Sequence, residues 1–242
     1  MLTAAFWGFV GGSALLLGAA AGVWLRVSHR VIALIMGFGA GVLISALAFE
    51  LTEGAFETGG ADAVSVGLAA GALVFVGGDW LIDREIGIRA ERKGGPDEDG
   101  GATSIALGAL LDGIPESAVI GISLLTGQGV SAAVVAAVFL SNVPEAMGSA
   151  ARMRQSGRST GFIFALWTGV LAVSVLAATL GYGLLGSASA NTVGVIQAFA
   201  AGAIITMLAT TMIPEAHDDG GPLVGLATAL GFSLAFLLST IE

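Results

Sequence analysis

Residues 102–125 have the sequence ATSIALGALLDGIPESAVIGISLL. This segment is long enough to cross a bilayer, which takes roughly 20 mostly apolar residues in a helix. Its charged side chains are two carboxylates, Asp112 and Glu116, close to its middle. The segment therefore predicts a membrane-spanning helix that carries acidic groups at the depth of the hydrocarbon core.

The rest of the chain has the same character. Of the 242 residues, 11% are charged and 55% are hydrophobic, whereas a soluble domain carries about a quarter charged residues. We expect an all-α integral membrane protein, a single transmembrane domain over residues 1–242 that has the lipid bilayer as its surroundings. The one substantial polar segment, 83–101, predicts a solvated cytoplasmic loop. Division of the chain at charged or Gly/Asn/Pro-rich stretches gives about eight spans, near 3–25, 31–52, 63–82, 102–125, 130–152, 160–185, 192–214 and 222–241.

The charge pattern excludes one class of partner and predicts the orientation. A net charge of −9 argues against nucleic acid, whose binding needs a basic surface. All Lys and Arg residues lie in the first, third and fifth connections of the predicted path, and such residues concentrate in cytoplasmic loops. We therefore expect both termini outside, in a multi-pass protein of the cell membrane (plasma or inner). These basic residues are Arg26, Arg30, Arg84, Arg89, Arg92, Lys93, Arg152, Arg154 and Arg158.

Two internal repeats accompany the spans. A shift of 161 residues aligns the second span with the seventh, and these two spans run in opposite directions on the predicted path. An inverted repeat of this kind is frequent in transporters, although two Gly/Ala-rich helices can also match by chance. The aligned pairs are Phe38 with Phe199, Ala40 with Ala201, Gly41 with Gly202, Ile44 with Ile205, Leu47 with Leu208, and Gly59-Gly60 with Gly220-Gly221.

The second repeat, a shift of 29 residues, aligns the fourth span with the fifth. It places a Pro-Glu pair in the middle of each span, Pro115-Glu116 in the fourth and Pro144-Glu145 in the fifth. Each proline lacks the N–H that would bond the carbonyl four residues earlier. Freed backbone is tolerated at membrane depth where it lines a cavity. The alternative is a pair of structural kinks whose Glu residues bond a neighbouring helix.

Four polar residues on these spans form the predicted site. Asp112 and Glu116 are four residues apart and share a helix face, as do Ser141 and Glu145. Because neighbouring spans are antiparallel, we expect Asp112 at the level of Glu145 and Glu116 at the level of Ser141. An ionised carboxylate at the bilayer centre costs about 2.5–3.5 kcal/mol, and neither apolar stretch contains a basic side chain. The carboxylates must therefore be protonated, hydrated or bound to a cation.

The repeated Pro-Glu motifs, the eight expected spans and the outside termini resemble the ZIP (Zrt/Irt-like) family of divalent-metal transporters. The resemblance covers essentially the whole chain. In the family, the fourth span carries His-Asn-x-Pro-Glu-Gly and the fifth His-x-x-Pro-Glu. By position, the resemblance implies metal ligands at Asp112, Glu116, Ser141, Asn142 and Glu145.

This chain departs from the family pattern at both histidines. Asp112 and Ser141 replace them, Gly113 replaces the span-four Asn, and residues 160–185 lack the acidic ligand that many members have in the sixth span. The chain also has no cysteine. The predicted site is therefore built from oxygen ligands, which favour Mn, Mg and Ca over Zn and Fe. The resemblance implies Zn or Fe, so the cargo is expected among Zn, Fe and Mn.

These observations predict a transporter that moves a divalent metal cation towards the cytoplasm, with the ion as its substrate and no cofactor. An enzyme is not expected, because both histidines, His29 and His217, lie outside the predicted membrane core and a metallohydrolase helix needs His-Glu-x-x-His. Two alternatives stay open: a cation/proton exchanger of another fold, and a transport-inactive relative that senses metal. A homodimer is compatible with the sequence.

Acidic groups at both ends of the predicted path fit an ion route. Glu50, Glu53 and Glu57 recur at helical spacing at the outer end of the second span, where they could concentrate cations. A solvated helix end is the alternative. A second group, expected at the inner end of the seventh span as a release site, consists of Glu215, His217, Asp218 and Asp219.

Overall fold

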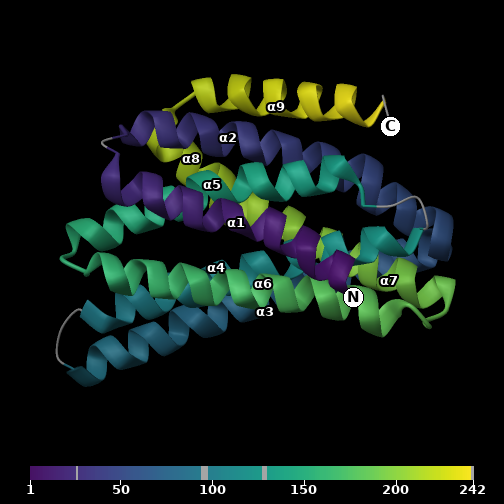
Figure 1. The fold of residues 1–242 in the computed structure, drawn as a ribbon, viewed down its shortest axis with the longest axis horizontal. Helices are drawn as coiled ribbons and strands as arrows, with labels where there is room; N and C mark the ends of the chain where they lie inside the picture. Colours follow the sequence, from purple (N-terminus) through teal and green to yellow (C-terminus); the bar gives the residue numbers. More distant parts are fainter. Residues whose placement is uncertain (26, 94–97, 127–129, 241–242) are drawn as a thin grey trace.

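The computed structural model describes residues 1–25, 27–93, 98–126 and 130–240, and every regular element in these residues is helical (Figure 1). The helices run side by side along the long axis, and both termini lie towards the right in this view. Two short π-helical segments, η1 and η3, interrupt longer helices. The elements are α1 Leu2–Trp24, α2 His29–Ala46, η1 Leu47–Thr52, α3 Glu53–Lys93, α4 Glu98–Ser123, η2 Leu124–Thr126, α5 Ala132–Gln155, α6 Thr160–Leu185, α7 Ala190–Met207, η3 Leu208–Met212, α8 Ile213–Gly220 and α9 Leu223–Ser239.

By length and composition, six helical segments of the described chain can cross a membrane. The chain is therefore a multi-pass membrane protein, as the composition predicted. A shorter apolar helix, Leu223–Ser239, is additional to these six. The six are Leu2–Trp24, His29–Arg84, Ile105–Ser123, Ala132–Gln155, Thr160–Leu185 and Ala190–Gly220.

The count differs from the expected eight for two physical reasons. The segment His29–Arg84 is 56 residues long because helical structure continues on both sides of Gly60, where the backbone turns at φ 72° and ψ −175°. The last helix, α9, has only 17 residues. The described residues of the eight expected ranges are still mostly helical, and Gly60 lies between the second and third of these ranges.

The segment expected as a loop, 83–101, is more helical than the sequence indicated. Helix α3 continues to Lys93 and α4 begins at Glu98, so only residues 94–97 lie between them, outside the described residues. Glu, Arg and Lys are good helix formers, and a helix that leaves a bilayer can therefore continue through them. The cytoplasmic location of this segment stays a prediction.

The helices pack as two groups. In the first, which we term the site bundle, α1 packs on α5 and α6, and α4 packs on α6. In the second, termed the repeat bundle, α3 packs on α7, and α2 packs on α9 and α8. Contacts of α2 with α5, which are at least as extensive as those of α2 with α8, and smaller contacts of α4 with α7 and of α3 with α4 join the bundles. The predicted site residues all belong to the site bundle.

The repeat bundle contains two copies of one backbone pattern, in agreement with the 161-residue shift. The first copy starts with Ser28, whose hydroxyl accepts a hydrogen bond from the Val31 N–H, and the second starts with Ser189, which accepts one from Thr192. Each copy continues through a helix and a π-helical segment, η1 or η3. Gly60 (φ 72°) and Gly221 (φ 63°) then turn the chain. In Figure 1, α2 runs from left to right and α7 from right to left.

Candidate metal centre

Glu116 and Ser141 meet at the centre of the site bundle. The Ser141 hydroxyl donates a hydrogen bond to Glu116 Oε1 at 3.2 Å, with Oε2 at 3.4 Å, and it also lies 3.0 Å from the Val138 carbonyl oxygen. Glu116 is 1% exposed and Ser141 is 2% exposed. The expected pairing of these two residues across antiparallel spans is confirmed. A carboxyl group this deeply buried needs partners, because burying an unpaired charge is costly.

Asp112 and Glu145 form the second level of the site. Both side chains are partly buried, and among the neighbouring charges Asp112 acts most strongly on Glu145, followed by Glu116. This order agrees with the expectation that Asp112 lies at the level of Glu145. The three carboxylates therefore repel one another when ionised, and the positive charge of a divalent cation nearby would relieve that repulsion.

Asn142 has a different partner from the other predicted ligands. Its side-chain amide donates to the Gly11 carbonyl oxygen at 3.4 Å, which ties α5 to α1. Asn142 is 3% exposed, so this hydrogen bond satisfies one of its buried donors. The structure thus brings Glu116, Ser141, Asp112 and Glu145 towards one another and holds the Asn142 amide group against α1.

The proline in α5 places a free carbonyl at the boundary between the bundles. Pro144 cannot donate to the Leu140 carbonyl, and this oxygen faces Gly39 of α2, where a Cβ would come within 3.0 Å of it. Glycine at position 39 therefore leaves the Leu140 oxygen uncovered by a side chain. This oxygen lies next to Ser141 and is of the type that hard cations prefer, in accord with the expectation that the Pro-Glu motifs free backbone oxygens.

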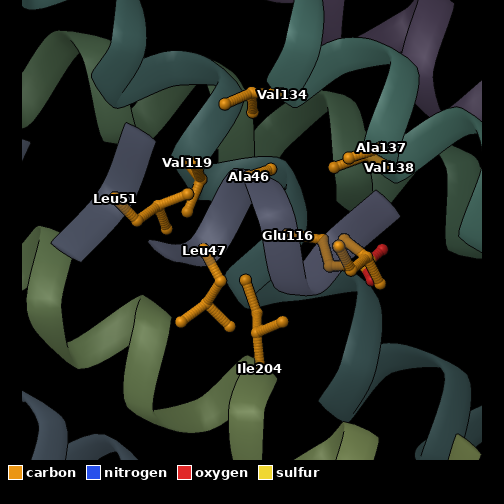
Figure 2. A pocket seen from close by; sticks show the side chains of 10 residues that line it. Ala46, Leu47, Leu51, Glu116, Val119, Val134, Ala137, Val138 and Ile204 are labelled. Carbon is orange, nitrogen blue, oxygen red and sulfur yellow. The ribbon is translucent and has the colours of Figure 1, made fainter. Parts of the chain in front are cut away.

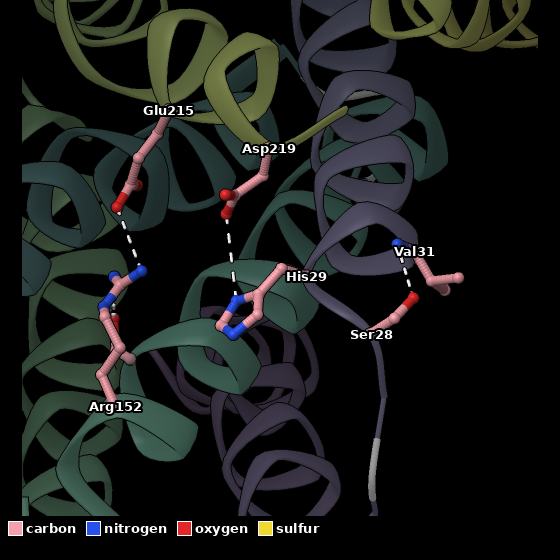
Figure 3. A network of polar contacts seen from close by, with 7 residues as sticks. Ser28, His29, Val31, Arg152, Glu215 and Asp219 are labelled. Carbon is pink, nitrogen blue, oxygen red and sulfur yellow. Dashed lines mark hydrogen bonds and ion pairs between the residues drawn. The ribbon is translucent and has the colours of Figure 1, made fainter. Parts of the chain in front are cut away.

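A third Pro-Glu pair approaches the site from the other bundle. Pro214-Glu215 begins α8, immediately after η3, and the Glu215 carboxylate lies close enough to act on both Asp112 and Glu145. Its oxygen Oε1 is 3.2 Å from Arg152 Nη1 of α5 (Figure 3). The sequence indicated a release site at Glu215 but not this proximity. The signal that could have found it is the recurrence of Pro-Glu after Ile or Val in three helices.

A cavity of about 950 Å³ opens at the end of the molecule opposite to Arg152 and Arg154. We term it the vestibule. Its lining includes Glu50, Glu53, Glu57 and Gln197, and the Gln197 amide donates to the Glu50 carbonyl at 3.2 Å. The three glutamates that were expected at the outer end of the second span therefore gather around one cavity.

Apolar side chains separate the vestibule from Glu116. Between them lies a pocket of only about 10 Å³, in which Glu116 is the sole charged residue (Figure 2). A cavity of this size is at the limit for a single water molecule, so a hydrated ion cannot pass. We term the apolar lining of this pocket the plug. It consists of Leu43, Ala46, Leu47, Leu51, Val119, Val134, Ala137, Val138 and Ile204.

The donor set around Glu116 consists of carboxylate, hydroxyl and backbone carbonyl oxygens, which suit hard divalent cations. Within the described residues, no three His, Asp or Glu side chains are close enough together to hold one ion. The carboxylates of the site make polar contacts in pairs: Glu116 accepts a hydrogen bond from Ser141, and Glu215 forms an ion pair with Arg152.

No protein-family profile matches the chain, and no curated protein sequence matches it.

Proposed function

We infer that this protein transports a divalent metal cation across the membrane through the carboxylate site on α4 and α5. One observation carries the proposal: Glu116, buried to 1% exposure in an apolar membrane segment, has a serine hydroxyl as its hydrogen-bond partner. A structural carboxylate at this depth would be expected to pair with a basic group. Asp112 and Glu145 add further negative charge instead. Such a set of groups is suited to hold a cation.

The ligand chemistry limits the class of cargo. Oxygen ligands bind Mn more readily than the softer sites of imidazole and thiolate do, and discriminate less sharply in favour of Zn. We therefore propose Zn, Fe or Mn as the transported ion. Metal must displace protons from carboxyl groups that cannot all ionise together, so binding weakens as the pH falls. The choice of Zn, Fe or Mn also follows from the resemblance of the two Pro-Glu motifs to those of the ZIP family.

We propose eight membrane crossings, with His29–Arg84 crossing twice by turning at Gly60 and α9 crossing once. The inverted orientation of the two repeats supports this path, because the helix that follows each copy packs on the other copy, α3 on α7 and α9 on α2. The basic connections then lie in the cytoplasm, both termini lie outside, and the vestibule faces outward. Transport is directed towards the cytoplasm in the cell membrane.

The two bundles provide a physical means of alternating access. In this conformation the plug separates Glu116 from the vestibule. Plug residues come from both bundles: Leu47 and Ile204 from the repeat bundle, Val119 and Val138 from the site bundle. A displacement of one bundle along the other would part them and open the site to the vestibule.

Two alternatives remain as candidate functions. A cation/proton exchanger would use the same carboxylates, but known exchangers place their acidic motifs in two inverted halves, whereas here they lie on consecutive helices. A metal sensor without transport would bind the ion but show no flux. Parallel measurements of binding and flux on the same protein separate these functions.

The decisive test replaces the two glutamates of the site. We expect Glu116→Gln and Glu145→Gln each to lower metal flux at least about tenfold, because glutamine keeps the size and hydrogen bonding of glutamate but loses its charge. Flux of Mn, Zn and Fe into proteoliposomes is measured per folded protein. The control is Asp62→Asn, which removes an exposed carboxylate outside the vestibule lining.

Folding should survive both glutamine substitutions, since removal of a buried charge relieves a cost of about 2.5–3.5 kcal/mol. A structural role for the glutamates predicts the reverse, with poor expression and normal flux per molecule. Normal flux in both variants with every metal would refute the transport site.

A further inference from the structure

The ion pair between Arg152 and Glu215 joins the two bundles at the end of the molecule that carries the basic connections. Arg152 belongs to α5 of the site bundle and Glu215 to α8 of the repeat bundle, and their charged atoms are 3.2 Å apart. Arg152 also donates to the Ser149 hydroxyl at 3.3 Å, one turn earlier on its own helix. The guanidinium group is therefore fixed on α5 and reaches across to α8 (Figure 3).

No other side-chain hydrogen bond or ion pair between two described residues connects these bundles. Glu116 with Ser141 and Asn142 with Gly11 lie within the site bundle. Within the repeat bundle are Gln197 with Glu50 and His29 with Asp219, the latter at 3.9 Å.

Apart from Asp79 and Glu215 of the repeat bundle, whose like charges act on Asp112 of the site bundle, the side-chain contacts described between the bundles are apolar. Gly39 of α2 lies against the α5 backbone at Leu140, a Cβ added at Gly148 of α5 would lie 3.7 Å from an Ile32 methyl group, and the plug occupies the vestibule side. Such a surface offers little resistance to sliding, because small residues and packed methyl groups make no directional bonds. Among the described side chains, the Arg152–Glu215 pair is thus a directional contact that a displacement of the bundles must break.

We propose that the Arg152–Glu215 ion pair is a latch that holds the bundles in the conformation in which the plug seals the site from the vestibule. The latch and the plug lie at opposite ends of the same interface. The latch is at the basic end, beyond Glu145 on α5, and the plug is on the vestibule side of Glu116. A movement that parts the plug therefore separates Arg152 from Glu215. The proposal rests on alternating access by the proposed transporter.

The size of the effect follows from the exposure of the pair. The side chains of Arg152 and Glu215 are 47% and 46% exposed, and exposed ion pairs contribute little, so that loss of one changes an equilibrium by at most about fivefold. A latch of this strength biases the two conformations without locking either. It slows opening only modestly, as transport requires.

The test measures how often the plug opens, without any transported ion. The chain has no cysteine, so single cysteines at the plug residues Ala46 and Ala137, 5% and 1% exposed, can report on it. Each is reacted with an impermeant methanethiosulfonate in sealed vesicles with metal chelated. Thr58→Cys, in the vestibule lining, identifies the vesicles whose vestibule faces the reagent and measures access to the vestibule itself.

In both reporters we expect Arg152→Gln and Glu215→Gln each to raise the labelling rate about two- to fivefold. The charge-reversed double variant, Arg152→Glu with Glu215→Arg, should return the rate towards that of the parent. Two matched controls should leave it unchanged. Arg154→Gln removes a neighbouring basic residue, and Asp219→Asn breaks the His29–Asp219 contact, which stays within one bundle.

Labelling rates equal to the parent in both single variants would overturn the latch, as would a double variant that labels as fast as the single ones. Because this readout needs no metal, it is independent of the flux test. Loss of flux in Glu116→Gln with unchanged labelling in the latch variants would refute the latch alone. Faster labelling with normal flux in Glu116→Gln and Glu145→Gln would refute the transport site alone.

Discussion

The two copies in the repeat bundle share one backbone and differ in their polar side chains. Both begin at a serine cap, pass through a π-helical segment and end at a glycine with positive φ, Gly60 or Gly221. The first copy carries Glu50, Glu53 and Glu57, which line the vestibule. The second has Thr211, Pro214 and Asp218 at the positions 161 residues later.

This difference shows that the repeat preserves the glycines that the backbone turns need, whereas the acidic side chains that could attract an ion are not preserved. Gly60 and Gly221 adopt φ and ψ values close to those that only glycine tolerates, so the turn fixes their identity. The acidic residues have no such constraint. The first copy places its acids around the vestibule, and the second places Glu215 beside Arg152 at the opposite end.

The largest expected effect tests the opposite orientation of the two copies. Cysteines placed just before each copy, Leu25→Cys and Ser187→Cys, occupy exposed positions. We expect the cysteine at 187 to react fully with an impermeant thiol reagent on intact cells, and the one at 25 to react only after permeabilisation, because α2 and α7 run in opposite directions. Mass spectrometry of the labelled protein measures both.

A cysteine at Ser156, exposed in the connection between α5 and α6, should behave like the one at 25. Equal labelling of positions 25 and 187 from outside would contradict the inverted repeat, whereas the fully reversed pattern would contradict only the orientation deduced from the basic residues.

The second test asks whether the two copies pack equivalently. An added Cβ at Gly41 would overlap the Thr228 carbonyl oxygen of α9, and one at Gly202 would overlap the Leu68 carbonyl oxygen of α3. We expect Gly41→Ala and Gly202→Ala each to destabilise the folded protein by about 1–3 kcal/mol, because backbone atoms must move to admit the methyl group. Thermal unfolding of the purified protein, followed by size-exclusion chromatography, measures the loss.

The controls are Gly225→Ala in α9 and Gly77→Ala in α3, where a Cβ meets nothing within 4 Å. Alanine there should be neutral or stabilising, since it is the better helix former. If only one of the two variants, Gly41→Ala or Gly202→Ala, is destabilised, the two copies differ in helix packing as well as in their polar side chains.

The sequence was sufficient for the features that depend on short-range spacing. Asp112 and Glu116 lie one helical turn apart, so their shared face followed from the helix period. The contact of Glu116 with Ser141 followed from the antiparallel order of consecutive spans. The first residue of each repeat copy could also be predicted, since Ser28 and Ser189 precede helices that the 161-residue shift aligns.

Features that depend on packing between distant spans were beyond the sequence. Glu215 is 63 residues from Arg152, and only the packing of α8 brings them together. The amide nitrogen of Asn142 donates to the Gly11 carbonyl oxygen of α1, a helix whose Gly18 and Gly22 lie against the α5 backbone, and the sequence did not indicate this contact. The break between the second and third expected spans agrees with the turn at Gly60, but the helical structure between residue 52 and this turn was missed because a Gly-Gly pair and nearby charges normally indicate a loop.

The smallest expected effect sharpens the chemical difference between the copies. Because Glu53 and Glu57 are exposed in the vestibule, they should raise the local concentration of cations without binding them specifically. We expect the double variant Glu53→Gln with Glu57→Gln to lower kcat/KM for metal flux by about threefold at low salt, with kcat unchanged. At high ionic strength the Debye length falls to about 3 Å, so the variant should then match the parent.

The control for this test is Asp62→Asn, which removes an exposed carboxylate of the same helix that does not line the vestibule. It should leave kcat/KM unchanged at every salt concentration. A loss that persists at high salt would mean that Glu53 or Glu57 ligates the ion directly, because direct coordination is screened far less than attraction at a distance. The first copy would then hold an ion site of its own, and its difference from the second copy would lie in binding rather than in attraction.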